Sequence, residues 1–111
     1  MSTAFWTAVR QQLAELRTAR NADDALRTLA PERNPYRLED PTWDGMDPGA
    51  EGFFGGSGGD DRVDEALEDA GWTYAWSKAA YWWAMRAPDG SAVTYCEGDV
   101  YRGVRPDPTA S

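Results

Sequence analysis

The residues most able to do chemistry in this sequence are carboxylates, and five of them fall close together. They are Asp61, Asp64, Glu65, Glu68 and Asp69. At about 100° per residue they cover one broad side of a helix, and the apolar residues between them form a narrow stripe. Carboxylates one helical turn apart lie about 5–6 Å from each other. This acidic ridge is therefore predicted to attract a basic protein surface, or to imitate the phosphates of a nucleic acid strand.

Other acidic groups suggest a metal site or acid–base chemistry. Asp60, Asp61 and Asp64 could surround a divalent cation, although their spacing fits no EF-hand loop. Glu97 and Asp99 could act as a catalytic pair, but they flank a glycine in a predicted turn, where acids are common. A small metal-binding protein or enzyme remains an alternative. We nevertheless predict that this protein has no catalytic residue and binds no metal ion and no cofactor.

The composition excludes several kinds of function. The 111 residues include no His and one Cys, which rules out a His-based triad, a His-ligated metal and an internal disulfide. The net charge of −8 disfavours direct binding of nucleic acid. No apolar run approaches the roughly 18 residues of a membrane span. We see no secretory signal, and a free Cys96 suits a reducing cytoplasm, so a cytoplasmic location is expected.

Aromatic residues supply a second kind of candidate contact. Phe53 and Phe54 are adjacent in a Gly-rich segment. Because neighbours in an extended chain point to opposite sides, we expect one ring to anchor the segment and the other to face a partner. Trp82 is expected on the less covered face of a sheet, where it could contact a partner or a second copy of the chain.

Hydrophobic spacing and capping residues predict three helices. The first runs from a cap at Ser2 or Thr3 to about Arg20, and the second covers 22–30 after a cap at Asn21. The third carries the acidic ridge and ends before Gly71. Residues 32–59 contain three Pro and seven Gly and are predicted to form a long irregular loop.

The remainder is predicted to be a β-meander with strands near 72–77, 81–87 and 92–96. Pro88-Asp89-Gly90 is typical of a hairpin turn, and a three-residue loop pairs Met85 with Val93 and Trp83 with Tyr95. Those four side chains are expected to face the core, while residues 100–101 could extend the sheet. The predicted fold is α+β, with three short helices packed on one face of a three-stranded antiparallel meander. It forms one domain, 1–103, with a flexible tail, 104–111.

Through four short sequence motifs, this chain resembles a group of small proteins of actinobacteriophages with no assigned function. The motifs are GFFGGSGGDD, AGW, APDGS and EGDVYRG. The signature carries no known chemistry, so the resemblance implies no site residue. It implies instead a phage accessory protein that acts in the cytoplasm of a host bacterium. The 17 Ala, 11 Gly and 10 Arg, with no Ile, agree with a GC-rich source.

The leading hypothesis is a non-enzymatic protein that binds a host protein with a basic surface. The acidic ridge, Phe53, Phe54 and Trp82 would form the contact. One alternative is a nucleic-acid mimic that inhibits a host DNA-binding or defence enzyme. Further alternatives are a virion or assembly component and a homodimer formed through the sheet face near Trp82.

Overall fold

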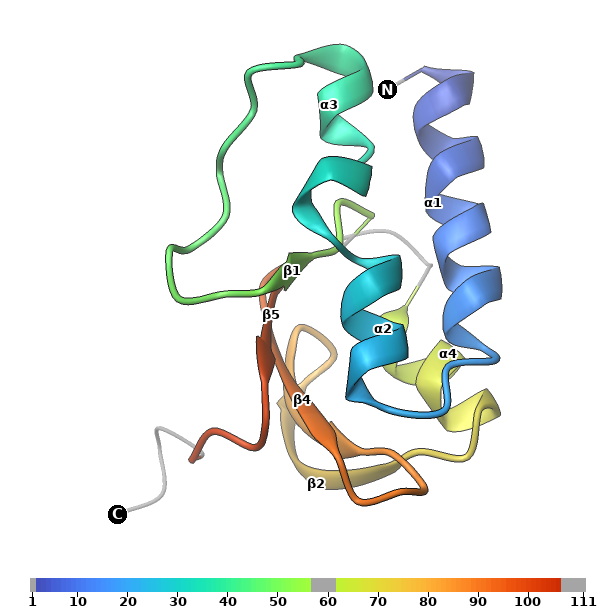
Figure 1. Ribbon diagram of the computed structural model, residues 1–111, viewed down its shortest axis with the longest axis vertical. Coiled ribbons are helices and arrows are strands. Elements are labelled where there is room, and N and C mark those ends of the chain that lie inside the picture. The colour runs from blue at the N-terminus through green and yellow to red at the C-terminus, as the bar shows by residue number, and fades with distance from the viewer. Residues whose placement is uncertain (1, 57–61, 107–111) are drawn as a thin grey trace.

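A computed structural model describes residues 2–56 and 62–106, which form one antiparallel sheet with helices on one of its faces (Figure 1). The helices are α1 (Thr3–Leu16), α2 (Ala22–Thr28), the 3₁₀ helix η1 (Pro31–Arg33), α3 (Tyr36–Glu39) and α4 (Val63–Asp69). The strands are β1 (Gly52–Phe53), β2 (Thr73–Ala79), β3 (Trp82–Arg86), β4 (Ala92–Cys96) and β5 (Asp99–Arg102). Their order in the sheet is β1-β5-β4-β3-β2.

The predicted α+β class is confirmed, but the sheet has five strands where three were expected. The fourth, β5, is the extension foreseen at residues 100–101. The fifth, β1, lies inside the segment predicted to be irregular, where Gly52 pairs with Val100. The same segment also holds η1 and α3. Elements of two to four residues are too short to leave a periodic pattern in a sequence.

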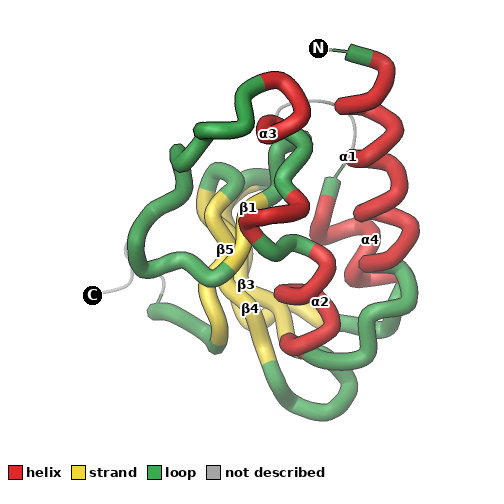
Figure 2. Tube along the Cα trace, turned by 45° about the horizontal axis from the view of Figure 1, so that its top comes forward, coloured by secondary structure: helices red, strands yellow, loops and turns green. Residues whose placement is uncertain are grey.

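Local capping explains where the first two helices begin. The Ser2 side chain accepts a hydrogen bond from the Phe5 amide, and the Asn21 side chain accepts one from the Asp24 amide. Helix α1 ends at Leu16, earlier than predicted, because residues 17–18 continue only as a turn. Figure 2 shows α1 beside α2 and α4, on the side of the sheet where the core lies.

The hairpin of β3 and β4 has the predicted register. Met85 lies opposite Val93 and Trp83 opposite Tyr95. All four side chains are buried, and the Trp83 and Tyr95 rings stack with centroids 5.0 Å apart. Gly90 takes a φ of +91° in the turn, a conformation that favours glycine.

Strand β2 departs from the regular alternation of a strand at a β-bulge. The register shifts between Tyr74 and Trp76, so Tyr74 lies opposite Met85 while Trp76 lies opposite Ala84. A bulge adds one residue to one strand and thereby reverses the side to which the next side chains point. Two residues apart in a regular strand, Tyr74 and Trp76 would share a face, but the bulge separates them, and Trp76 joins Trp82 on the face away from the helices.

Residues 103–106 cross this second face. The Gly103 amide donates to the Ala92 carbonyl at 2.8 Å, and the Arg105 amide donates to the Thr94 hydroxyl at 2.8 Å. The first residues of the predicted tail are therefore attached to the sheet. In the described part of the chain, no helix combines the length and the apolar character needed to cross a membrane.

Candidate functional site

The acidic ridge is interrupted at its centre by an internal ion pair. Asp64 is only 1% exposed and accepts hydrogen bonds from Arg62 Nε at 3.1 Å and Arg62 Nη2 at 2.6 Å. It also accepts one from the Tyr74 hydroxyl at 2.8 Å. The prediction that Asp64 contacts a partner is therefore wrong, because its carboxylate is enclosed between its own helix and strand β2.

The other described members of the ridge are exposed, but each has a partner in the same chain. Glu65 lies 3.3 Å from Arg62, and Asp69 lies 3.5 Å from Arg17. Glu68 accepts a hydrogen bond from the Tyr74 hydroxyl at 3.1 Å. Asp61 lies outside the described residues. Two arginines thus partly neutralise this surface, which weakens the comparison with a row of phosphates.

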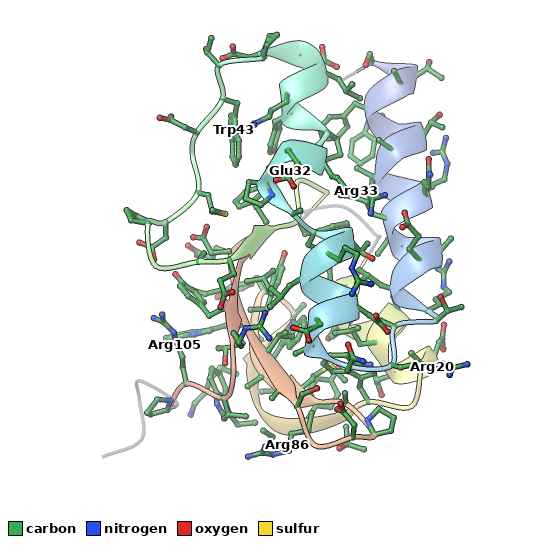
Figure 3. The ribbon with its side chains drawn as sticks, in the orientation of Figure 1. Arg20, Glu32, Arg33, Trp43, Arg86 and Arg105 are labelled. Carbon is green, nitrogen blue, oxygen red and sulfur yellow. The ribbon has the colours of Figure 1, made fainter. Side chains whose placement is uncertain are left out.

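The adjacent phenylalanines point to different environments, as predicted, but neither is freely available. Phe54 is fully buried in the core, so its assignment as a partner contact is wrong. Phe53 is half-buried, because Trp43 covers it at a centroid distance of 4.8 Å. Figure 3 shows Trp43 reaching inward from the long loop that connects α3 to β1.

The remaining acidic candidates have structural roles or lie apart. Asp99 accepts a hydrogen bond from the Asp47 amide at 3.0 Å, and Glu97 occupies the turn with a φ of +48°. Across residues 2–56 and 62–106, no three His, Cys, Asp or Glu side chains gather as they would around a metal ion. Asp60, the first residue of the suggested cation site, lies outside that part.

Trp82 lines an open groove on the sheet face away from the helices. The groove has a volume of about 460 Å³ and is formed by strands β2 to β5 and the segment that crosses them. Its lining residues are Trp76, Trp82, Thr94, Cys96, Tyr101, Arg105 and Pro106. We call it the aromatic groove. Sequence patterns missed Trp76 because a bulge has no clear signature, and missed Arg105 because it follows the last strand.

Hydrogen bonds and ring contacts hold the walls of the aromatic groove in place. The Trp76 and Trp82 rings meet edge to face, with centroids 6.4 Å apart. The Trp76 indole N–H donates to the Arg105 carbonyl at 2.8 Å. The guanidinium carbon of Arg105 lies 3.7 Å above the centre of the Tyr101 ring. One aromatic surface of the groove therefore already carries a cation.

Carboxylates border the same groove. The Tyr101 hydroxyl donates to Asp47 at 3.0 Å. Burial, followed by this hydrogen bond, raises the pKa of Tyr101 to about 12. Burial raises the pKa of the Cys96 thiol, and the charges of Glu97 and Asp99 raise it further. These effects favour the protonated thiol, which is the less reactive form.

A smaller hollow adjoins the aromatic groove. It has a volume of about 280 Å³, shares Trp82 and Cys96 with the groove, and is completed by Tyr81 and Glu97. Tyr81 is 53% exposed. The two hollows share Trp82 and form one surface of partly exposed aromatic rings with carboxylates at its edge, which suits a ligand that combines positive charge with apolar groups.

No protein-family model, curated protein or solved structure matches this chain. Its function must therefore be inferred from the geometry of its own residues.

Proposed function

We propose that this chain is a non-enzymatic binding protein whose aromatic groove holds a basic, extended segment of a partner protein. The observation that carries the proposal is the position of Arg105 on the Tyr101 ring, beside the Asp47 carboxylate. This internal arginine makes the contact that a partner's arginine would make with the neighbouring indole rings. Trp is the aromatic side chain that attracts cations most strongly.

Charge complementarity favours a basic occupant over a second copy of the chain. Each copy carries a net charge of −8, so two copies repel each other, whereas a basic partner is attracted. Asp47, Glu97 and Asp99 place part of that charge at the groove. A homodimer through this face is the competing outcome, and light scattering at several concentrations distinguishes it from a monomer.

The proposal moves the contact surface from the acidic ridge to the opposite side of the molecule. It keeps the partner that the sequence analysis favoured, a host protein with a basic surface. Mimicry of nucleic acid is less well supported, because Arg62 and Arg17 interrupt the ridge on which it depended.

A titration with model peptides tests the proposal. The probe is acetyl-Gly-Arg-Pro-Arg-Gly-amide, and its control replaces both arginines by glutamate. We expect the arginine peptide to shift the NMR signals of the Trp76 and Trp82 indole N–H groups, and added salt to weaken the effect. The glutamate peptide should leave both signals unchanged.

A matched pair of variants locates the contact. Trp82→Ala is expected to weaken binding about fivefold or more, as loss of a cation–π contact predicts. Trp6→Ala is the control, because Trp6 is also half-buried but lies on α1 at the other side of the sheet. Equal binding of both peptides, or equal loss in both variants, would rule out the groove as the binding site.

A further inference from the structure

A second pocket, remote from the aromatic groove, lies where α1 meets η1 and α3. It has a volume of about 380 Å³, and its walls include Gln12, Glu32, Arg33, Asn34, Arg37 and Leu38. Figure 3 shows Arg33 between η1 and α1, with Glu32 on η1, whereas Arg105 lies on the far side of β5. We call it the polar pocket, because most of its wall residues can form hydrogen bonds.

Gln12 brings an unpartnered acceptor to the polar pocket. Its side chain is 2% exposed, and its Nε2 donates to the carbonyls of Thr28 at 3.1 Å and Arg33 at 3.3 Å. These two bonds fix the orientation of the amide, because only the nitrogen can donate. The remaining atom, Oε1, is buried and has no donor within residues 2–56 and 62–106.

Two donors in the same pocket are also unpartnered. Asn34 is 2% exposed, and its Oδ1 accepts a hydrogen bond from the Tyr36 amide at 3.0 Å, which starts α3 and fixes the side chain. Its buried Nδ2 has no acceptor in the described part of the chain, and the same is true of Arg37 Nε. By contrast, the guanidinium of the neighbouring Arg33 is held by both oxygens of Glu15.

Buried polar atoms without partners are rare in folded proteins, because each loses its bonds to water without replacement. Here the three residues that carry two such donors and one such acceptor line one pocket. One donor belongs to Arg37, a cation that forms no salt bridge with the described residues. A complementary ligand must therefore offer a negatively charged acceptor group together with a nearby N–H.

We propose that the polar pocket binds a carboxylate with an adjacent amide N–H, as found at the C-terminal residue of a peptide and in N-acylated amino acids. The carboxylate accepts from Arg37 and Asn34, since a guanidinium and a carboxylate match in shape as well as charge. The ligand N–H donates to Gln12 Oε1. The site is independent of the aromatic groove, so either can fail without the other.

The ligand chemistry is tested with N-acetylglycine and two analogues that each lack one feature. The methyl ester of N-acetylglycine lacks the carboxylate, and acetate lacks the N–H. We expect N-acetylglycine to shift the side-chain NMR signals of Gln12, Asn34 and Arg37, and each analogue to bind at least tenfold more weakly. A short peptide with a free C-terminus that binds more tightly than N-acetylglycine indicates a peptide as the natural source, and the reverse order indicates a small metabolite.

Two variants of one residue and a control test the site itself. Arg37→Met is expected to reduce binding at least tenfold, while Arg37→Lys keeps the charge, loses the planar fork and should bind with intermediate affinity. Arg10→Met is the control, because Arg10 is exposed on α1 outside the pocket. Circular dichroism checks that each variant is folded. If Arg37→Met does not fold, Arg37→Lys still tests the site. The proposal is overturned if N-acetylglycine causes no shift at millimolar concentration, if the analogues bind as well, or if the folded Arg37 variants bind like Arg10→Met.

Discussion

The buried carboxylate of Asp64 gives the sharpest test of the fold, because the same residue was first assigned to the surface. Replacing it with alanine removes four hydrogen bonds at once. The donors are Arg62 Nε at 3.1 Å, Arg62 Nη2 at 2.6 Å, the Glu65 amide at 3.0 Å and the Tyr74 hydroxyl at 2.8 Å. The bond from Tyr74 connects the start of α4 to strand β2, and the other three hold the first turn of α4, so their loss should loosen that junction.

The expected loss of stability is smaller than four separate bonds would suggest. A hydrogen bond to a charged group contributes about 1.5–3 kcal/mol. After the substitution, however, the Arg62 side chain, which is 38% exposed, regains water, and the Tyr74 hydroxyl keeps its bond to Glu68. We therefore expect Asp64→Ala to lower the free energy of unfolding by about 2–4 kcal/mol. In a domain of this size that lowers the melting temperature by roughly 10–25 °C.

Glu65→Ala is the matched control for this measurement. Glu65 is the next residue in α4 and pairs with the same Arg62, but its side chain is 60% exposed. An exposed pair of this kind contributes about 0–1 kcal/mol, so the control should stay close to the parent protein. Urea unfolding followed by circular dichroism measures both variants, and an unchanged m-value shows that the comparison is of stability alone. The reasoning is refuted if Asp64→Ala lowers the free energy of unfolding by less than about 1 kcal/mol, or by no more than Glu65→Ala does. The Asp64 carboxylate would then not stabilise the junction between α4 and β2.

Three further predictions concern the turn and the aromatic groove. Gly98→Ala should destabilise the protein by about 1–3 kcal/mol more than Gly90→Ala. Both glycines have positive φ, but a Cβ at Gly98 would lie 2.8 Å from the Phe53 ring, whereas a Cβ at Gly90 would meet nothing within 4 Å. Equal melting temperatures of the two variants would contradict this prediction. At pH 8, Cys96 should react with a disulfide reagent more slowly in the folded protein than in the unfolded chain, because burial and the carboxylates of Glu97 and Asp99 raise its thiol pKa. Equal reaction rates in the two states would show that these groups do not affect the thiol. Tyr101 should ionise near pH 12 in an absorbance titration, and Asp47→Asn should lower that pKa. Because the pKa of the Tyr101 phenol is higher in the folded state, the protonated phenol contributes its full stabilisation below pH 10, and this stabilisation is lost between about pH 10 and 12. The Tyr101→Phe variant should therefore lose less stability over that pH range than the parent protein.

Parts of this fold that depend on neighbouring residues alone could be predicted from the sequence. The Pro88-Asp89-Gly90 turn sets the register of β3 against β4, since a turn of known length aligns the residues on either side of it. Ser2 and Asn21 mark helix starts because a capping side chain bonds to an amide only three residues ahead. The alternation of residues 82–86 likewise identified the buried face of the hairpin.

Only part of the aromatic groove could be predicted from the sequence. Trp82 was correctly placed on the face away from the helices, because its register follows from the hairpin. Trp76 and Arg105, which complete the aromatic groove, were not identified. A bulge in β2 moves Trp76 there, and hydrogen bonds to Thr94 and Trp76 hold Arg105 over the sheet. The bulge depends on how β2 pairs with β3, and Arg105 depends on partners 11 and 29 residues away in the chain, so no local pattern reports either position.

The charged residues show the same division most clearly. The sequence by itself determined that α4 carries a dense row of carboxylates beside a narrow apolar stripe. It did not determine that Asp64 is buried, because that depends on Arg62 and on Tyr74 of strand β2 closing over it. The polar pocket arose in the same way, from Gln12 on α1, Arg37 on α3 and Asn34 in the link between η1 and α3. A side chain's type sets what it can bind, but only the tertiary packing decides which partners it meets and which of its atoms remain without one.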